Sequence, residues 1–122
     1  MEKSFTNKTY LEKVLHVGLD VGSTTVKIIV MDENKNTIYK DYQRHYSDTK
    51  NTVCQVLESL LLKYPLNSFT LALTGSGAMS AAKFLGVNFI QEVVSCKRAV
   101  EKYIPKTDVV IELGGEDAKI IY

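Results

Sequence analysis

The stretch "VLHVGLDVGSTTVKIIVMDENKNTIYKDY", Val14–Tyr42, decides the fold of this chain. Its apolar residues, many of them β-branched, alternate with polar ones or run together over Val14–Asp20 and Thr24–Met31, which is typical of adjacent strands. The turn cluster "DENKN" at 32–36 separates the second strand from a third over Thr37–Arg44. Three strands joined by short turns predict an antiparallel meander.

After the meander the spacing of apolar residues becomes helical. One helical run ends at Pro65, and a second, rich in small residues, ends at Gly86. A short strand over Ser68–Thr74 separates them, a further helix covers Glu92–Ile104, and Thr107–Tyr122 has the pattern strand, Gly-Gly turn, strand. This order predicts the α/β class, with a mixed sheet that contains an antiparallel three-strand meander and is flanked by helices. It is the layout of a ribonuclease-H-like domain, as in one half of an actin-like ATPase.

Composition and charge narrow the function classes. The 122 residues carry 15 basic and 14 acidic side chains, a balance that argues against a nucleic-acid or anionic membrane partner. The sequence has no apolar run of about 18 residues and a polar start, so we expect a cytoplasmic protein. Residues 1–12 have the character of a flexible arm, and 13–122 that of one folded unit. Because the chain stops directly after a strand, we expect a fragment of a longer protein.

The turn between the first two strands carries residue types suited to a phosphate. Gly22 allows the backbone to approach an anion closely, and the next residues offer hydroxyl and amide donors. Asp20 ends a strand where its carboxylate would serve Mg²⁺ or its waters, and Lys27 would bring a point charge to a phosphate oxygen. The alternative is a plain hairpin turn with a solvated lysine. The candidate phosphate ligands of this turn are Gly22, Ser23, Thr24, Thr25 and Lys27.

Two further small-residue turns follow apolar strands. In "ELGGED", Glu112–Asp117, carboxylates flank two glycines, which a plain Gly-Gly hairpin does not explain. "TGSG", Thr74–Gly77, leads into a helix N-terminus, and such ends attract anions although Gly and Ser are ordinary there. Turns at the ends of successive strands would converge at one edge of the sheet, where ligands of α/β sheets bind. The sequence contains no G-x-x-x-x-G-K-[ST] or G-x-G-x-x-G motif, which excludes a P-loop or Rossmann site.

Together these motifs resemble those of a known family. "GLDVGSTTVK" and "IELGGEDAK" are similar to the first and second phosphate motifs of the actin, Hsp70 and sugar-kinase superfamily of ATPases. The order of motifs most resembles the N-terminal part of the 2-hydroxyacyl-CoA dehydratase activator family, which is related to the ATPase subunits of benzoyl-CoA reductase. The matching stretches are Gly22–Lys27, Thr74–Gly77, Ser95–Cys96 and Gly114–Lys119.

The resemblance implies a function and a set of site residues. Members are homodimeric ATPases that hold a 4Fe–4S cluster between two subunits and use ATP hydrolysis to drive an electron into a dehydratase or reductase. Carried over to this chain, the resemblance makes Asp20, Glu112 and Asp117 catalytic, with Asp20 serving Mg²⁺ mostly through water. The residues implied to bind ATP or ADP are Gly22, Ser23, Thr24, Thr25, Lys27, Thr74, Gly75, Gly114, Gly115 and Glu116.

The chain departs from the family pattern at several positions. Glu112 stands where Asp is usual, and its extra methylene would shift a water-positioning carboxylate by about an ångström, enough to slow the chemistry. Glu116 replaces the usual Gln, and Lys97 the His that commonly follows the Ser-Cys pair. The family's cluster-ligating cysteines and its adenosine-binding second domain are not in this sequence. We therefore expect the parent protein to be an ATPase and the isolated chain to bind nucleotide weakly and to be inactive.

Other interpretations of the same residues stay open. A ribonuclease-H-type nuclease would need a carboxylate at the end of the fourth strand, where Thr74 stands. A sugar or acid kinase, or a non-catalytic regulatory domain, would share both phosphate turns. Cys96 lies on an apolar helical stripe and is expected to be a buried core thiol. His45 lies in a polar loop and is expected to be solvated.

Overall fold

The computed structural model describes residues 13–115 and 117–122. The expected arm over 1–12 and residue Glu116 lie outside them. The elements are β1 (Val14–Val21), β2 (Thr25–Met31), β3 (Thr37–Arg44), α2 (Thr49–Lys63), β4 (Ser68–Thr74), α3 (Ala78–Leu85), β5 (Asn88–Phe89), α4 (Glu92–Tyr103), β6 (Val110–Leu113) and β7 (Ala118–Ile121). The predicted order is confirmed, and the short β5 is an addition to it.

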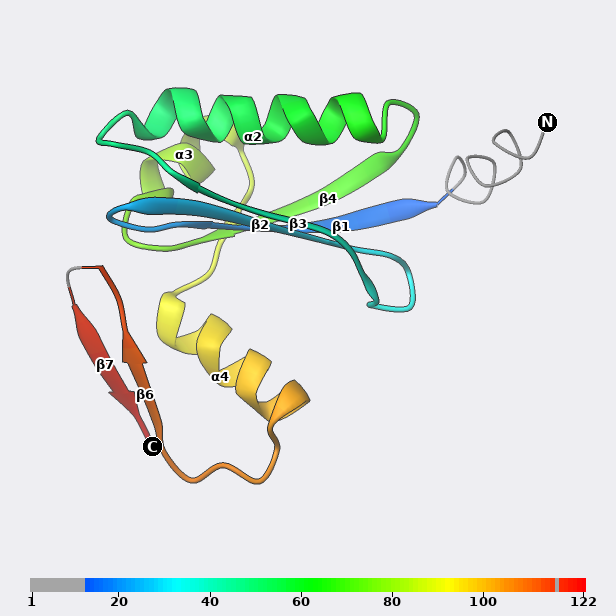
Figure 1. The fold of residues 1–122 in the computed structure, drawn as a ribbon. Coiled ribbons are helices and arrows are strands. Elements are labelled where there is room, and N and C mark those ends of the chain that lie inside the picture. The colour runs from blue at the N-terminus through cyan, green and yellow to red at the C-terminus, as the bar shows by residue number, and fades with distance from the viewer. Residues whose placement is uncertain (1–12, 116) are drawn as a thin grey trace.

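The described residues form a five-stranded mixed sheet in the order β3-β2-β1-β4-β5 (Figure 1). β1, β2 and β3 pair antiparallel, which confirms the predicted meander. β1 pairs in parallel with β4, from Val14 opposite Ser68 to Asp20 opposite Thr74. Because these two central strands run in the same direction, the residues that end them lie side by side at one edge of the sheet.

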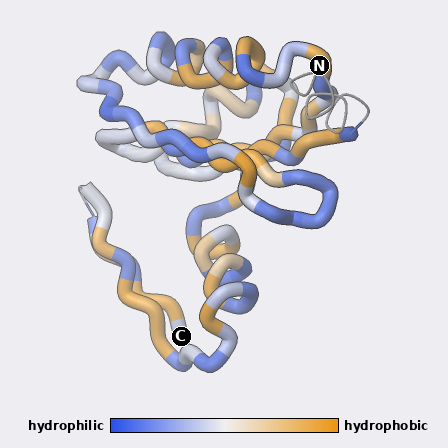
Figure 2. Tube along the Cα trace, turned by 45° about the vertical axis from the view of Figure 1, so that its right-hand side comes forward, coloured by the Kyte–Doolittle hydropathy of each residue, from blue (hydrophilic) through white to orange (hydrophobic). Residues whose placement is uncertain are grey.

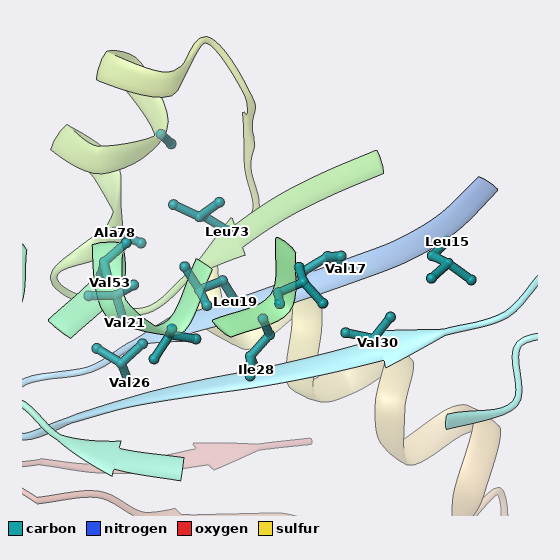
Figure 3. Close-up of a cluster of buried hydrophobic side chains, with 13 residues drawn as sticks. Leu15, Val17, Leu19, Val21, Val26, Ile28, Val30, Val53, Leu73 and Ala78 are labelled. Atoms are coloured by element: carbon teal, nitrogen blue, oxygen red, sulfur yellow. The ribbon is translucent and has the colours of Figure 1, made fainter. Parts of the chain in front are cut away.

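The core lies on one face of this sheet, under α2 and α3 (Figures 1 and 3). The alternation along β1 produces it, because every second side chain from Leu15 to Val21 points to this face and is buried. Removing each such side chain from water stabilises the fold by roughly 1.5–3 kcal/mol. The buried apolar residues are Leu15, Val17, Leu19, Val21, Val26, Ile28, Val30, Val53, Val56, Leu60, Leu73, Ala78 and Ala82.

The helix ends follow the sequence signals. α3 ends at Gly86, whose φ of 66° is left-handed and confirms the predicted stop. α2 ends with Tyr64 as its C-cap, directly before Pro65, and α4 with Ile104 directly before Pro105. Each proline denies the next turn a backbone donor.

α4 lies on the side of the sheet opposite α2 (Figure 1). Its expected packing into a core, with Cys96 as a buried thiol, was wrong: α4 has no fully buried residue among those described, Cys96 is half-buried, and Tyr103 is 61% exposed. The physical reason is the sheet face that α4 meets, which carries Gly18 and Asp20 and leaves a cavity. β6 and β7 form their own two-stranded sheet beside α4 instead of extending the large one.

Candidate functional site

The β1–β2 turn closes on itself at the sheet edge. The Gly22 N–H donates to the Thr25 carbonyl at 2.9 Å. Ser23 is exposed and Thr24 half-buried, so their hydroxyls are open to a ligand. Thr25 is only 7% exposed, and its carbonyl accepts the bond from Gly22, so this residue lies under the turn and is not open to a ligand.

A residue that sequence reasoning misjudged holds this turn in place. His45 was expected to be solvated, which was wrong: it is 6% exposed. Its Nε2 lies 3.0 Å from the Gly22 carbonyl oxygen, and its backbone N–H donates to the Thr24 carbonyl at 3.1 Å. The β2–β3 register explains its burial, because Thr25 faces Arg44 and residue 45 therefore reaches the turn; the sequence predicted the meander but not this register.

The β6–β7 turn faces the β1–β2 turn although the two are far apart in the sequence. A Cβ added to Gly115 would lie 2.8 Å from Thr24 Oγ1 and 3.5 Å from Ser23 Oγ. The Gly114 N–H donates to the Asp117 carbonyl at 2.8 Å and closes the turn. A side chain at 115 would therefore force the Thr24 and Ser23 side chains to move, which favours glycine at this position.

The turn after β4 completes the site. Gly75 has a φ of 105°, and a Cβ there would lie 2.3 Å from the Val21 carbonyl oxygen and 2.6 Å from Asp20 Oδ1. The Gly77 N–H donates to the Val21 carbonyl at 2.8 Å. The structure therefore brings all three small-residue turns to the edge where β1 and β4 end.

Asp20 and Lys27 face each other across β1 and β2. Lys27 Nζ lies 3.5 Å from Asp20 Oδ2, and the two side chains are 47% and 40% exposed. The ammonium also lies 5.7 Å from the centre of the Tyr42 ring. An exposed pair of this kind stabilises by roughly 0.2–1 kcal/mol, so a ligand with more charge can separate it at small cost.

A cavity of about 460 Å³ lies between α4 and the sheet, next to these turns. Asp20, Lys27, Thr74, Cys96 and Glu112 are among its lining residues. Thr74 Oγ1 is buried and has no hydrogen-bond partner in the part of the chain that the structure describes. The pKa of the Cys96 thiol is raised, because burial disfavours the thiolate and the Glu112 carboxylate repels it and accepts a hydrogen bond from the neutral thiol.

The hairpin is tied to α4 by charge. Lys119 of β7 forms an ion pair with Glu92 at the start of α4 and a second one, 3.2 Å long, with Asp117. The hydrogen bond to Glu92, then that to Asp117, raises the pKa of Lys119 above its ordinary value. Asp117 therefore faces Lys119 and its own turn, and Glu116 lies outside the described residues.

Oxygen donors suited to Mg²⁺ gather beside the turns. Residues 13–115 and 117–122 contain no group of three or more His, Cys, Asp or Glu side chains arranged to hold a metal. Protein-bound Mg²⁺ commonly uses one or two carboxylates, substrate phosphates and water. The Asp20 and Glu112 carboxylates and the Thr74 hydroxyl line one cavity and are the oxygen groups there that would be available to such an ion.

The two cysteines do not fit an iron–sulfur cluster. Such clusters are held by several thiolates close together. Cys54 is exposed on α2 and Cys96 is half-buried on α4, on opposite sides of the sheet.

Of the helices in the described ranges, none is long and apolar enough to cross a membrane.

Comparison with known proteins adds sequence and fold relatives. No protein-family model matches the chain. The (R)-2-hydroxyglutaryl-CoA dehydratase activating ATPase of Acidaminococcus fermentans is 31% identical over 110 residues, which cover 87% of this chain and 41% of that protein. The chain thus spans about two fifths of the length of the curated relatives that it matches.

Two solved structures show the same arrangement of elements. The activator of the 2-hydroxyisocaproyl-CoA dehydratase from Clostridium difficile, with bound ADPNP, superposes with a TM-score of 0.71 at 27% identity over 87% of this chain and 40% of that one. Component A of the Acidaminococcus fermentans (R)-2-hydroxyglutaryl-CoA dehydratase gives a TM-score of 0.76 at 20% identity. The match covers 89% of this chain and 42% of that one. The actin-like ATPase fold is therefore confirmed, and so is the resemblance of this chain to the 2-hydroxyacyl-CoA dehydratase activator family.

Proposed function

We propose that the three converging turns bind the phosphates of Mg²⁺–ATP. On this proposal the chain is the phosphate-binding part of an ATPase that activates a 2-hydroxyacyl-CoA dehydratase or a related reductase by ATP-driven electron transfer. The observation that carries the proposal is the contact of Gly115 with Ser23 and Thr24, which sets two glycine turns face to face. The similar Clostridium difficile activator, solved with bound ADPNP, supports it.

Each turn has a distinct task in this site. The β1–β2 turn would donate from the Ser23 backbone N–H and from the hydroxyls of Ser23 and Thr24, while the Gly22 N–H closes the turn on the Thr25 carbonyl. Lys27 moves from Asp20 to a phosphate oxygen, since a polyanion attracts its ammonium more strongly than one exposed carboxylate. Gly115 would supply a further backbone donor, and Gly114, whose own N–H closes the turn on Asp117, leaves room beside it for an anion to approach. Thr74 and Gly75 close the site from β4.

The carboxylates serve the metal and the attacking water. Asp20 would hold Mg²⁺, mostly through its waters, and the ion would offset phosphate charge as the bond to the leaving oxygen breaks. Glu112 lines the same cavity and would orient the attacking water. Asp117 positions the second turn through Lys119 and its own backbone carbonyl.

The larger assembly is part of the proposal: the relatives' names support a dehydratase as the partner, and the homodimer is what the resemblance to the family implies. We propose that residues 13–122 belong to the first actin-like part of a cytoplasmic homodimer whose partner is a 2-hydroxyacyl-CoA dehydratase. Because Cys54 and Cys96 do not fit a cluster, a 4Fe–4S centre would be ligated by residues outside this sequence.

Isothermal titration of the purified chain with ATP and Mg²⁺ tests the proposal. We expect weak but saturable binding and negligible hydrolysis. Gly115→Val fills the space against Thr24 Oγ1 and should weaken binding about tenfold or more, since overpacking of this kind costs about 1–3 kcal/mol. Leu113→Ala, at an 80% exposed position of the same hairpin, is the matched control and should bind like the wild type.

Two results would contradict the proposal. One is the absence of binding at millimolar ATP, and the other is unchanged affinity in Gly115→Val. Hydrolysis by the isolated chain at about 1 s⁻¹ or faster, an ordinary enzymatic rate, would contradict its expected inactivity.

A further inference from the structure

We propose that His45 is a positioning residue for the phosphate-binding turn. Its neutral imidazole holds the Gly22–Ser23 peptide so that the Ser23 N–H points away from the ring, toward the ligand. The identity of the ligand rests on the proposed function, whereas the bracing of the turn rests on the hydrogen bonds of this structure alone.

Two hydrogen bonds join His45 to the turn. The ring Nε2 lies 3.0 Å from the Gly22 carbonyl oxygen, and the backbone N–H reaches the Thr24 carbonyl at 3.1 Å. At 6% exposure, the residue has little water to replace either bond. His45 therefore fixes the carbonyls of two residues in a turn that is otherwise closed by one bond, from Gly22 N–H to Thr25.

The ring's second nitrogen identifies the tautomer. The Ser47 N–H donates to His45 Nδ1 at 3.1 Å, so Nδ1 is the acceptor and the proton lies on Nε2. The Nε2–H is then the donor to the Gly22 carbonyl. A neutral ring with this tautomer satisfies both partners, and no other protonation state does.

The backbone after His45 is strained in order to make this arrangement. Tyr46 and Ser47 have φ values of 47° and 64°, in the left-handed region that residues with a side chain rarely adopt. Burial of Tyr46 does not explain the strain, because that side chain is 81% exposed. This conformation allows two hydrogen bonds back to His45. The Ser47 N–H donates to His45 Nδ1, and the Asp48 N–H donates to the His45 carbonyl at 2.7 Å. Strain kept beside a site points to a functional constraint.

The consequence for a ligand follows from peptide geometry. The described residues contain no cis peptide bond, and in a trans peptide the C=O and the next N–H point in opposite directions. With the Gly22 carbonyl held by His45, the Ser23 N–H must lie on the opposite side of the turn. An amide donor fixed before binding costs less to order when a phosphate arrives.

Three variants of His45 and one control separate this role from general stability. His45→Gln keeps a long amide N–H that can reach the Gly22 carbonyl, His45→Leu removes the donor, and His45→Asn keeps an amide that is too short. His16→Leu is the matched control, because His16 is exposed on β1 and bonds Thr70 Oγ1 at 2.7 Å, away from the turn. The readouts are amide hydrogen exchange, without nucleotide, of Gly22 and of residue 45, whose N–H groups donate to carbonyls of the turn, and titration with ATP and Mg²⁺.

We expect His45→Leu to speed exchange at Gly22 and at residue 45 and to weaken ATP binding, each about tenfold or more, as the loss of a buried hydrogen bond implies. His45→Gln should restore most of both, and His16→Leu should change neither. If His45→Leu does not fold, the Gln and Asn variants make the same comparison. The proposal would be overturned if His45→Gln behaved like His45→Leu or His45→Asn in both the exchange and the titration. If the wild type binds no ATP, the proposed function fails, and the exchange difference still decides whether His45 braces the turn.

Discussion

The five-stranded sheet with α2 and α3 forms one region of the molecule, and the segment from α4 to β7 forms another. Both contribute to the candidate site, but they are held by different forces. All thirteen buried apolar residues of the described ranges lie in β1, β2, α2, β4 and α3. In the second segment no described residue is fully buried, and Ile111, Leu113 and Ile120 are 64%, 80% and 57% exposed. Figure 2 shows these apolar stretches along the hairpin.

The difference teaches that the two halves of the proposed phosphate site have unequal stability. The β1–β2 turn projects from a hydrophobic core, whereas the Gly114–Gly115 turn projects from a hairpin held mainly by polar contacts, above all those of Lys119. Segments with few buried contacts open locally at low free-energy cost. The second half of the site should therefore move, and close on a ligand, while the first half stays fixed.

The largest effect should come from breaking the core. Leu19, 1% exposed in the middle of β1, loses its packing in Leu19→Ala, and we expect the free energy of unfolding to fall by about 2–5 kcal/mol. Leu113→Ala, the same change at an 80% exposed position, should stay within about 0.5 kcal/mol of the wild type. Urea denaturation measures both. Equal losses would show that the hairpin is part of the core.

A smaller and local effect should follow from releasing the hairpin. Lys119→Met removes the ion pairs with Glu92 and Asp117, so amides of β6 and β7 should exchange faster while those of β1 do not. Because these groups are partly exposed, the global free energy of unfolding should change by less than about 1 kcal/mol. The control is Lys97→Met, whose 4.0 Å pair with Glu101 is exposed and should matter to neither region.

The same pairs give a pH dependence with a defined sign. The hydrogen bond to Glu92 raises the pKa of folded Lys119, so its contribution is complete below the ordinary lysine pKa and is lost as the pH rises through the folded value. The protection factors of the hairpin amides, which are corrected for base-catalysed intrinsic exchange, should therefore stay constant up to alkaline pH. A fall of these protection factors near neutral pH would contradict this origin of the hairpin's stability.

The smallest effect concerns one thiol. Burial and Glu112 raise the pKa of Cys96, so at pH 8 less of it is thiolate and iodoacetamide should alkylate it several-fold more slowly than the exposed Cys54. Glu112→Gln removes the repelling charge and should speed the reaction of Cys96 alone. Mass spectrometry of the two cysteine peptides measures both rates. If Glu112→Gln left the alkylation rate of Cys96 unchanged, the Glu112 charge would not be a cause of the slow reaction.

The part of the fold that sequence analysis predicted is the part with strong periodic signals. Alternation along β1 and β2, the helical stripe before Pro65 and the left-handed Gly86 were all sufficient. The convergence of the turns was also predicted. In the structure it is produced by the parallel pairing of β1 with β4 and by the position of Gly115. β5 was not predicted, because a strand of two residues is too short to show an alternating pattern.

The remaining errors arose where tertiary context overrides a local pattern. α4 has an apolar stripe that includes Cys96, but a cavity separates it from the sheet face opposite, where Asp20 and Lys27 stand beside Ile29. His45 lies among polar residues, and its burial comes from the end of β3 folding back over Gly22. Thr25 belongs to the same class, since only the register of β2 shows that its side chain turns inward.

The pairing of β1 also sets an order of assembly. One edge of this strand pairs with β2 across a short turn, where Val21 faces Val26, and the other with β4, where Val14 faces Ser68. Contacts close in sequence form sooner than distant ones, so the hairpin should precede the parallel pair during synthesis. Until β4 and the α2 crossover have left the ribosome, the nascent chain presents β1 as an open strand edge, the surface most prone to pairing with another copy.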